Sequence, residues 1–219
     1  MPRRITRAFA DRVRAFARRY RGDKRGVAAI EFAMIVPIMF LLFIGAVELS
    51  QAITVDRRVT QVAGSVADLV ARKETSISQT EIGDIMKVGG YIVAPFSQSP
   101  LQMVLRNVSS SSGDATKTKQ SWQCTFSGAG KNPSPVCTCM NETYTLPPNL
   151  VSTNDSVVVA EVNYTYTPLI FDYFLKQALP NSSSGPGTYT LSEKIFMKPR
   201  GQAAMLLQGN GQPCPSPTF

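Results

Sequence analysis

A long apolar run near the N-terminus constrains this chain more than any other feature of its sequence. From Val27 to Val47 the sequence holds 21 residues and one charged side chain, that of Glu31. A helix needs about 20 apolar residues to cross the hydrocarbon core of a bilayer. The run therefore predicts a transmembrane helix. An unpaired carboxylate at the centre of such a helix costs on the order of 2.5–3.5 kcal/mol, so Glu31 needs a partner.

The segment before this run carries the net charge of the chain. Residues 1–25 contain ten arginines and lysines and two aspartates, which gives +8, and the whole chain also sums to +8. The positive-inside rule places such a basic segment on the cytoplasmic side of a membrane. A nucleic-acid-binding protein would instead carry its basic residues on a folded face, and this segment has too few apolar residues to build a domain. We therefore expect no nucleic-acid partner.

The helical pattern continues beyond the apolar run. Apolar residues recur every three to four positions as far as Val70, with charged and polar residues between them. One helix over residues 27–72 would be about 69 Å long at 1.5 Å per residue. The sequence thus predicts four parts, which are a basic leader (1–26), a transmembrane helix (27–47), a stalk helix (48–72) and a head (73–219).

The head is predicted to be α+β, with an antiparallel sheet and short helices. Ser78 and Glu81 have the spacing of a capping box that opens a second helix. Runs rich in β-branched and aromatic residues predict strands. These strands cover residues 101–108, 122–126, 156–167 and 188–197, and the last two are expected to pair antiparallel.

Two stretches of the head lack a strand pattern. Residues 127–148 are rich in Gly, Pro, Asn and Ser, which predicts a long irregular excursion. Residues 168–179 are apolar and predict a short helix that covers the sheet or docks on a partner.

Four cysteines, Cys124, Cys137, Cys139 and Cys214, follow the apolar run and are expected on the outer side of the membrane. Their even number predicts one or two disulfides in an oxidising compartment. Cys137 and Cys139 are too close in sequence to pair with each other, so we expect Cys124 to pair with one of them and Cys214 with the other. Unpaired thiols remain an alternative. A four-cysteine zinc site is a further alternative, although it normally shows Cys-x-x-Cys pairs.

The sequence offers little support for catalysis. It contains no histidine, which excludes a histidine-based triad, general base or metal site within the chain. It also lacks a Gly-x-Ser-x-Gly motif, a phosphate loop and a dinucleotide-binding glycine pattern. We expect no enzymatic activity, catalytic residue, cofactor or metal. The scattered carboxylates of the head are predicted to be solvated surface charges, and they are Glu142, Asp155, Glu161, Asp172 and Glu193.

The junction between the leader and the apolar run resembles that of a known family. Gly26-Val-Ala-Ala-Ile-Glu31-Phe32 is similar to the Gly-x-x-x-x-Glu-Phe/Tyr junction of Flp-type pilins and TadE-like pseudopilins, which are type IV pilin-like proteins. In that family a prepilin peptidase cuts after the glycine, which here would leave Val27 as the first residue. The resemblance implies a minor pseudopilin that assembles with other pilin-like subunits at an inner-membrane pilus platform. Its head would lie in the periplasm or on a surface filament.

A physical reason for the spacing of this junction can be given without the family. Cleavage would create an α-ammonium on Val27, one helical turn from Glu31. In a group of parallel helices, Glu31 would pair with the ammonium of a neighbour, and at low dielectric such a pair is far stronger than in water. Phe32 would lie in the same contact. The alternative is that Glu31 lies at the level of the lipid headgroups.

A secretory signal peptide is the strongest rival interpretation. It would use the same basic segment, an apolar core over residues 32–47 and a small-residue cleavage site at Ser50-Gln51-Ala52. The product would be a soluble periplasmic binding protein that begins at Ile53. The N-terminal residue of the mature protein therefore separates the two interpretations.

Overall fold

The computed structural model describes most of the chain beyond the basic leader. The described residues are 25–73, 75–129, 134–168, 170, 188–201, 205–208 and 213–219. Their contacts divide the chain into two compact units, Met1–Glu48 and Leu49–Phe219. The leader up to residue 24 and most of the predicted helix over residues 168–179 lie outside the described residues.

Helix α2 (Arg25–Ala71) supplies the first unit and continues into the second. It is the one helix in the described part of the chain that is long and apolar enough to cross a membrane, and its most apolar stretch has no buried residue. Pro37 lies inside this stretch, where membrane helices tolerate proline because other groups satisfy the freed backbone carbonyl. The prediction of one continuous helix through the apolar run is confirmed.

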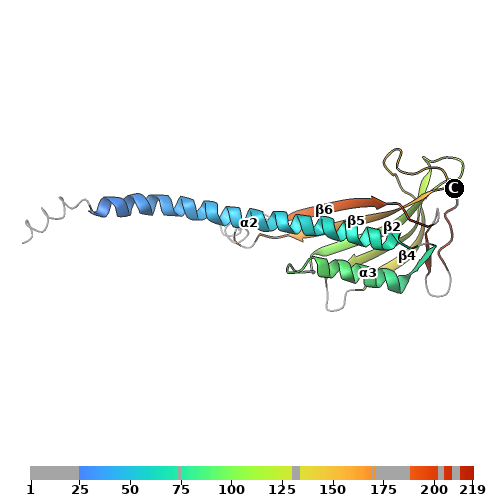
Figure 1. Ribbon diagram of the computed structural model, residues 1–219, viewed down its shortest axis with the longest axis horizontal. Coiled ribbons are helices and arrows are strands. Elements are labelled where there is room, and N and C mark those ends of the chain that lie inside the picture. The colour runs from blue at the N-terminus through green and yellow to red at the C-terminus, as the bar shows by residue number, and fades with distance from the viewer. Residues whose placement is uncertain are drawn as a thin grey trace, which may run out of the picture. The chain divides into compact units, whose positions relative to one another are not determined.

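The second unit, which we call the head, is built on a five-stranded antiparallel sheet with the strand order β4-β3-β2-β5-β6. Two short strands, β1 and β7, form a separate parallel pair. The α+β class and the antiparallel pairing of β5 with β6 are confirmed (Figure 1). The bounds are β1 (Ser76–Ser78), α3 (Gln79–Ile92), β2 (Leu101–Ser110), β3 (Thr118–Ser127), β4 (Val136–Thr143), β5 (Ser156–Tyr166), β6 (Tyr189–Met197) and β7 (Leu206–Gln208).

Helix α3 begins at the predicted capping box. The Ser78 hydroxyl accepts a hydrogen bond from the backbone N–H of Glu81 at 3.2 Å, and the Glu81 carboxylate accepts the Ser78 N–H at 3.0 Å. Lys73 adds an ion pair to this carboxylate at 2.7 Å. The Lys73 ammonium and the Ser78 N–H together lower the pKa of Glu81 to about 2. The cap therefore fixes where the chain turns from β1 into α3.

The two helices pack against one face of the sheet and form the main core of the head with it (Figure 1). The two helices and the sheet come close together at Gly89 of α3. A Cβ atom added there would lie 2.8 Å from Val66 Cγ2 of α2 and 3.1 Å from Met103 Sδ of β2. Real Cβ atoms essentially never approach a neighbour within 3.0 Å. Glycine at this position thus allows α3, α2 and the sheet to meet.

The opposite face of the sheet is crossed by the connection from β4 to β5. Because β4 is an edge strand and β5 lies beyond β3 and β2, residues 144–155 must pass over those two strands. Tyr144, Leu146 and Val151 of this connection pack on a second, smaller core. The prediction that all of residues 127–148 are irregular is wrong, because β4 lies among them and pairs with β3.

Candidate functional site

The residues predicted for processing and assembly are exposed at the start of α2. Gly26 and Glu31 are exposed, Val27 retains 51% of its accessible surface and Phe32 retains 67%. The helix places Glu31 one turn from Val27, because a turn takes 3.6 residues. Among the described side chains the structure shows no ion pair to Glu31. The described residues thus leave the carboxylate available to a second molecule.

Gly26 has no steric role in the described chain. A Cβ atom added at this position would meet no other atom within 4 Å. Glycine inside a helix costs about 0.8–1.0 kcal/mol relative to alanine. The local fold therefore gives no reason for glycine here, in contrast to Gly89.

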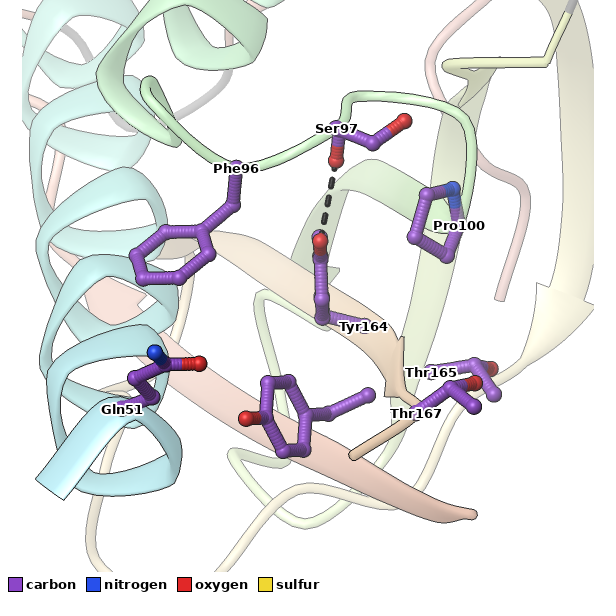
Figure 2. A pocket seen from close by; sticks show the side chains of 8 residues that line it. Gln51, Phe96, Ser97, Pro100, Tyr164, Thr165 and Thr167 are labelled. Carbon is purple, nitrogen blue, oxygen red and sulfur yellow. Dashed lines mark hydrogen bonds between the residues drawn. The ribbon is translucent and has the colours of Figure 1, made fainter. Parts of the chain in front are cut away.

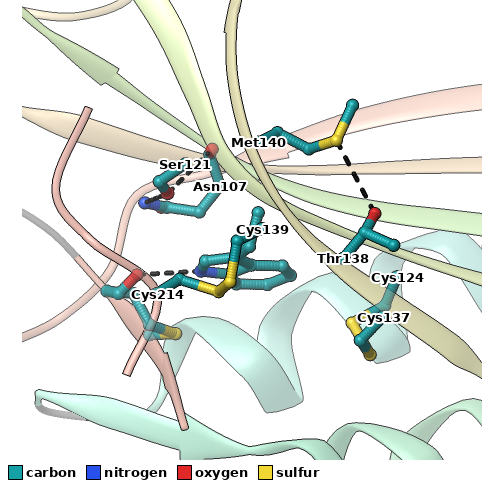
Figure 3. The surroundings of a disulfide bond; sticks show 10 residues. Asn107, Ser121, Cys124, Cys137, Thr138, Cys139, Met140 and Cys214 are labelled. Atoms are coloured by element: carbon teal, nitrogen blue, oxygen red, sulfur yellow. Dashed lines mark hydrogen bonds between the residues drawn. A yellow bond between two sulfur atoms is a disulfide. The ribbon is translucent and has the colours of Figure 1, made fainter. Parts of the chain in front are cut away.

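The four cysteines form two disulfides, in one of the two arrangements that the sequence left open. Cys124 and Cys137 are register partners and join β3 to β4. Cys139 on β4 is joined to Cys214 in the C-terminal segment (Figure 3). No described cysteine is free. All four thiols are consumed in these bonds, which leaves none for the alternative zinc site.

Three hydrogen bonds hold the C-terminal segment to β3 and β4 beside the second disulfide. The indole N–H of Trp122 donates to the carbonyl of Met205 at 2.9 Å. Lys119 donates to the carbonyl of Thr218 at 2.5 Å, and the Asn141 amide donates to the Thr218 hydroxyl at 3.0 Å. The end of the chain is thus part of the head rather than a free tail.

Glu161 of β5 is the centre of a polar cluster on the face of the sheet opposite the helices. Its carboxylate accepts hydrogen bonds from Arg106, from Lys194 at 2.7 Å and from the Tyr144 hydroxyl at 3.0 Å. Lys194 also lies 5.0 Å from the centre of the Tyr144 ring, a cation–π distance. Burial raises the pKa of Glu161, but these three donors outweigh it and lower the pKa to about 2. The cluster fixes the start of the crossing connection to three strands.

Asp155 closes the other end of the same connection. Its side chain accepts hydrogen bonds from the backbone N–H groups of Ser152 at 3.3 Å and Ser156 at 2.9 Å, and it pairs with Lys198 at 2.7 Å. Burial opposes these bonds, yet they hold its pKa below the ordinary value. The prediction that Asp155 and Glu161 are solvated surface charges is therefore wrong. The charged partners of both carboxylates are distant in sequence, so no local pattern marks these ion pairs.

A cavity of about 380 Å³ lies in the head between α2, β5 and the segment that follows α3. Figure 2 shows Phe96 and Gln51 on one side of it and Pro100 on the other. The Tyr164 hydroxyl donates to the carbonyl of Ser97 at 3.0 Å, which fixes that ring in the wall. No sequence pattern predicts this cavity, because its lining residues come from separate elements.

Comparison with known families confirms the resemblance seen at the junction. The family model described as TadE-like protein matches residues 26–68. The match begins at Gly26 and covers most of α2, but it includes no strand of the head. No curated protein matches the chain, and no solved structure does.

Proposed function

We propose that this chain is a minor pseudopilin-like, membrane-anchored component of a Tad-type pilus or a related secretion assembly. The observation that carries the proposal is the coincidence of three features in residues 26–68. These are the match to the TadE-like family, an apolar helix whose surface the chain itself leaves exposed, and a single carboxylate at its start. A helix with these properties completes its surface with lipid and with other helices.

Assembly depends on the junction in this proposal. A prepilin peptidase cuts after Gly26 and leaves an α-ammonium on Val27. Glu31 of one subunit then pairs with the ammonium of a neighbouring pilin-like subunit, and Phe32 packs beside the pair. A charge pair in a low-dielectric environment is sensitive to distance, so it favours one axial register between the two helices.

The proposed topology places the leader in the cytoplasm of a bacterium and the head in the periplasm. The ten basic residues of the leader support the first assignment through the positive-inside rule. The two disulfides of the head support the second, because disulfides persist in oxidising compartments. The partners are a prepilin peptidase, other pilin-like subunits and an inner-membrane assembly platform, and the chain acts through binding rather than catalysis.

The structure gives no specific support to a signal peptide that ends at Ala52. α2 continues through that position without a break. Ala52 belongs to the core of the head and Gln51 lines the head cavity. A cut between Ala52 and Ile53 would therefore remove residues that the head itself contacts.

The test is the N-terminal sequence of the protein isolated from membranes after coexpression with a prepilin peptidase of a Tad system. We expect Val27 as the first residue. Gly26→Leu should abolish the cut, whereas Gly45→Leu, at another glycine of α2, should leave it intact. An N-terminus at Ile53 would support the signal peptide instead. An uncut chain that remains in the membrane would refute the processing step.

A further inference from the structure

Three polar side chains, which we call the serine site, are buried inside the head on the face of the sheet that the helices cover. They are Asn107 and Ser109 of β2 and Ser156 of β5. Their neighbours along the two strands, Val108 and Val157, belong to the smaller core on the opposite face, and side chains alternate between the faces along a strand. Asn107 and Ser156 have no exposed surface, and Ser109 retains 6%. Polar groups at this depth need hydrogen bonds.

Two oxygen atoms of the serine site have no hydrogen-bond partner in the described part of the chain. They are Asn107 Oδ1 and Ser156 Oγ, and both are buried. The other half of the Asn107 amide is occupied, because its Nδ2 donates to the Ser121 hydroxyl at 3.0 Å and to the Ser109 hydroxyl at 3.4 Å (Figure 3). A buried polar atom without a partner has lost its bond to solvent and gained none in return. Most buried polar atoms of native proteins are paired with protein or with ordered water.

The two unpartnered oxygens lie beside the same third group. Ser109 and Ser156 are register partners on β2 and β5, and the Cβ atoms of such a pair lie about 4.5–5.5 Å apart. The Asn107 amide reaches the Ser109 hydroxyl from the other side. That hydroxyl accepts from the amide and still carries its own proton. One small molecule beside Ser109 can therefore contact all three side chains.

The charges around the serine site favour a neutral occupant. All three of its side chains are neutral. Asp155, the residue before Ser156, directs its carboxylate to two backbone N–H groups and to Lys198. A buried ion in the serine site would thus lack the opposite charge that it needs. A molecule that donates as well as accepts hydrogen bonds suits the site.

The sizes of the side chains leave room for a small occupant only. Leu105 and Met103 are the preceding residues of β2 on the same face, and both are fully buried in the main core. A serine carries one heavy atom beyond Cβ, so the surface of the sheet is lower at Ser109 and Ser156 than at these neighbours. Buried waters typically make about three hydrogen bonds to groups that would otherwise be unsatisfied. The serine site offers that number.

We propose that the serine site binds one structural water molecule. The water donates to Asn107 Oδ1 and to Ser156 Oγ, and it accepts the Ser109 hydroxyl proton. Rotation of the amide by 180° would turn its NH2 group toward the water, which then accepts from it, so the site serves both orientations. The water joins β2 to β5 beside the C-terminal segment, because Lys119, the partner of Ser109 on β3, binds Thr218.

The experiment uses the full chain in detergent micelles and measures the magnetic relaxation dispersion of ¹⁷O in the solvent. This measurement counts the water molecules that a protein holds for longer than its tumbling time. Ser156→Val places methyl groups in the serine site, so we expect the count to fall by about one. The matched variant Ser192→Val makes the same change at an exposed position of β6. It should leave the count unchanged.

The alternatives give different results. Equal dispersion for the parent protein and Ser156→Val would overturn the proposal, and so would an equal fall in Ser192→Val. Loss of the parent's signal on addition of calcium, with Ser156→Val unaffected, would assign the site to a cation instead. If Ser156→Val does not fold, Asn107→Leu removes another partner and fills the same space with a side chain of similar size. It should then show the same loss of about one water.

Discussion

The two units of this chain differ in whether they bury their apolar side chains. In the first unit the apolar side chains of α2 face outward, and the described chain does not cover them. In the head, two helices, a sheet and two disulfides enclose a core of their own. The match to the TadE-like family covers the exposed helix and stops before the strands. The matched region therefore contains the whole exposed apolar stretch and also the part of α2 that is buried in the core of the head.

The largest expected effect concerns Glu31, in the exposed part of α2. Glu31→Gln removes the charge proposed to meet a neighbour's ammonium, while the head keeps all of its contacts. Removing one partner of a buried ion pair costs about 3–5 kcal/mol, so association with other pilin-like subunits should weaken roughly hundredfold or more. Co-purification of subunits from membranes measures this.

The control for that experiment is Asp56→Asn, which makes the same chemical change at an exposed position of α2 in the head. It should assemble like the parent protein. If Glu31→Gln also assembles normally, Glu31 is a headgroup-level residue and the proposed ion pair does not exist.

The next effect concerns the disulfides, which the anchor lacks. Cys139–Cys214 spans 75 residues and Cys124–Cys137 spans 13. In the chain-entropy model these loops contribute about 4.5 and about 3 kcal/mol. Replacing the cysteines of the longer loop by alanine should lower the free energy of unfolding more than replacing those of the shorter loop. Denaturant unfolding of each double variant in detergent tests this order, and the reverse order would show that packing around Cys124 dominates.

A smaller effect on stability is expected from substitutions at two glycines of the head. Gly89→Leu should destabilise the head by roughly 2–3 kcal/mol, because the new side chain overlaps Val66 and Met103. Gly64 lies inside α2, and a Cβ atom there would meet Ile195 at an ordinary 3.7 Å. Gly64→Ala should therefore stabilise the head by up to about 1 kcal/mol. Thermal unfolding measures both, and equal shifts for the two variants would contradict the close packing at Gly89.

The smallest expected effect depends on pH. The pKa of Glu161 in the folded head is about 2, below its ordinary value. Its stabilising contribution is therefore complete above the ordinary pKa and disappears as the pH falls through about 2. Glu161→Gln should lower stability at pH 5 by about 2 kcal/mol and reduce the further loss between pH 5 and pH 2. Glu142→Gln makes the same chemical change on an exposed carboxylate of β4, and at pH 5 it should lower stability by much less than Glu161→Gln. Glu81 contributes a similar dependence to every variant.

The sequence predicted those elements whose signal is local. The apolar run, the capping box at Ser78 and the β-branched segment of β5 all gave elements that the structure contains. It missed β4, because Val136–Thr143 is an exposed edge strand without the apolar alternation of a buried one. That strand is held by pairing with β3 and by two disulfides, which composition does not reveal.

The polar cluster and the cavity were missed for a related reason. Arg106, Glu161 and Lys194 lie on three different strands, and they meet only because the sheet order is β2-β5-β6. The cavity likewise combines α2, β5 and the segment after α3. Sequence patterns describe neighbours along the chain, whereas both of these features are made by tertiary contacts.

The pairing of β1 with β7 has a consequence for the order of events in folding. β1 is the first strand after α2, and its partner lies near the C-terminus. Contacts between residues so distant in sequence form late, because the loop between them must close first. The head therefore completes its fold only when the segment around β7 is in place. Until then, the carbonyl of Met205 is not in place to accept the Trp122 indole N–H, and Cys139 has no partner thiol to oxidise with. The fold of the head thus depends on joining segments from its two ends in sequence.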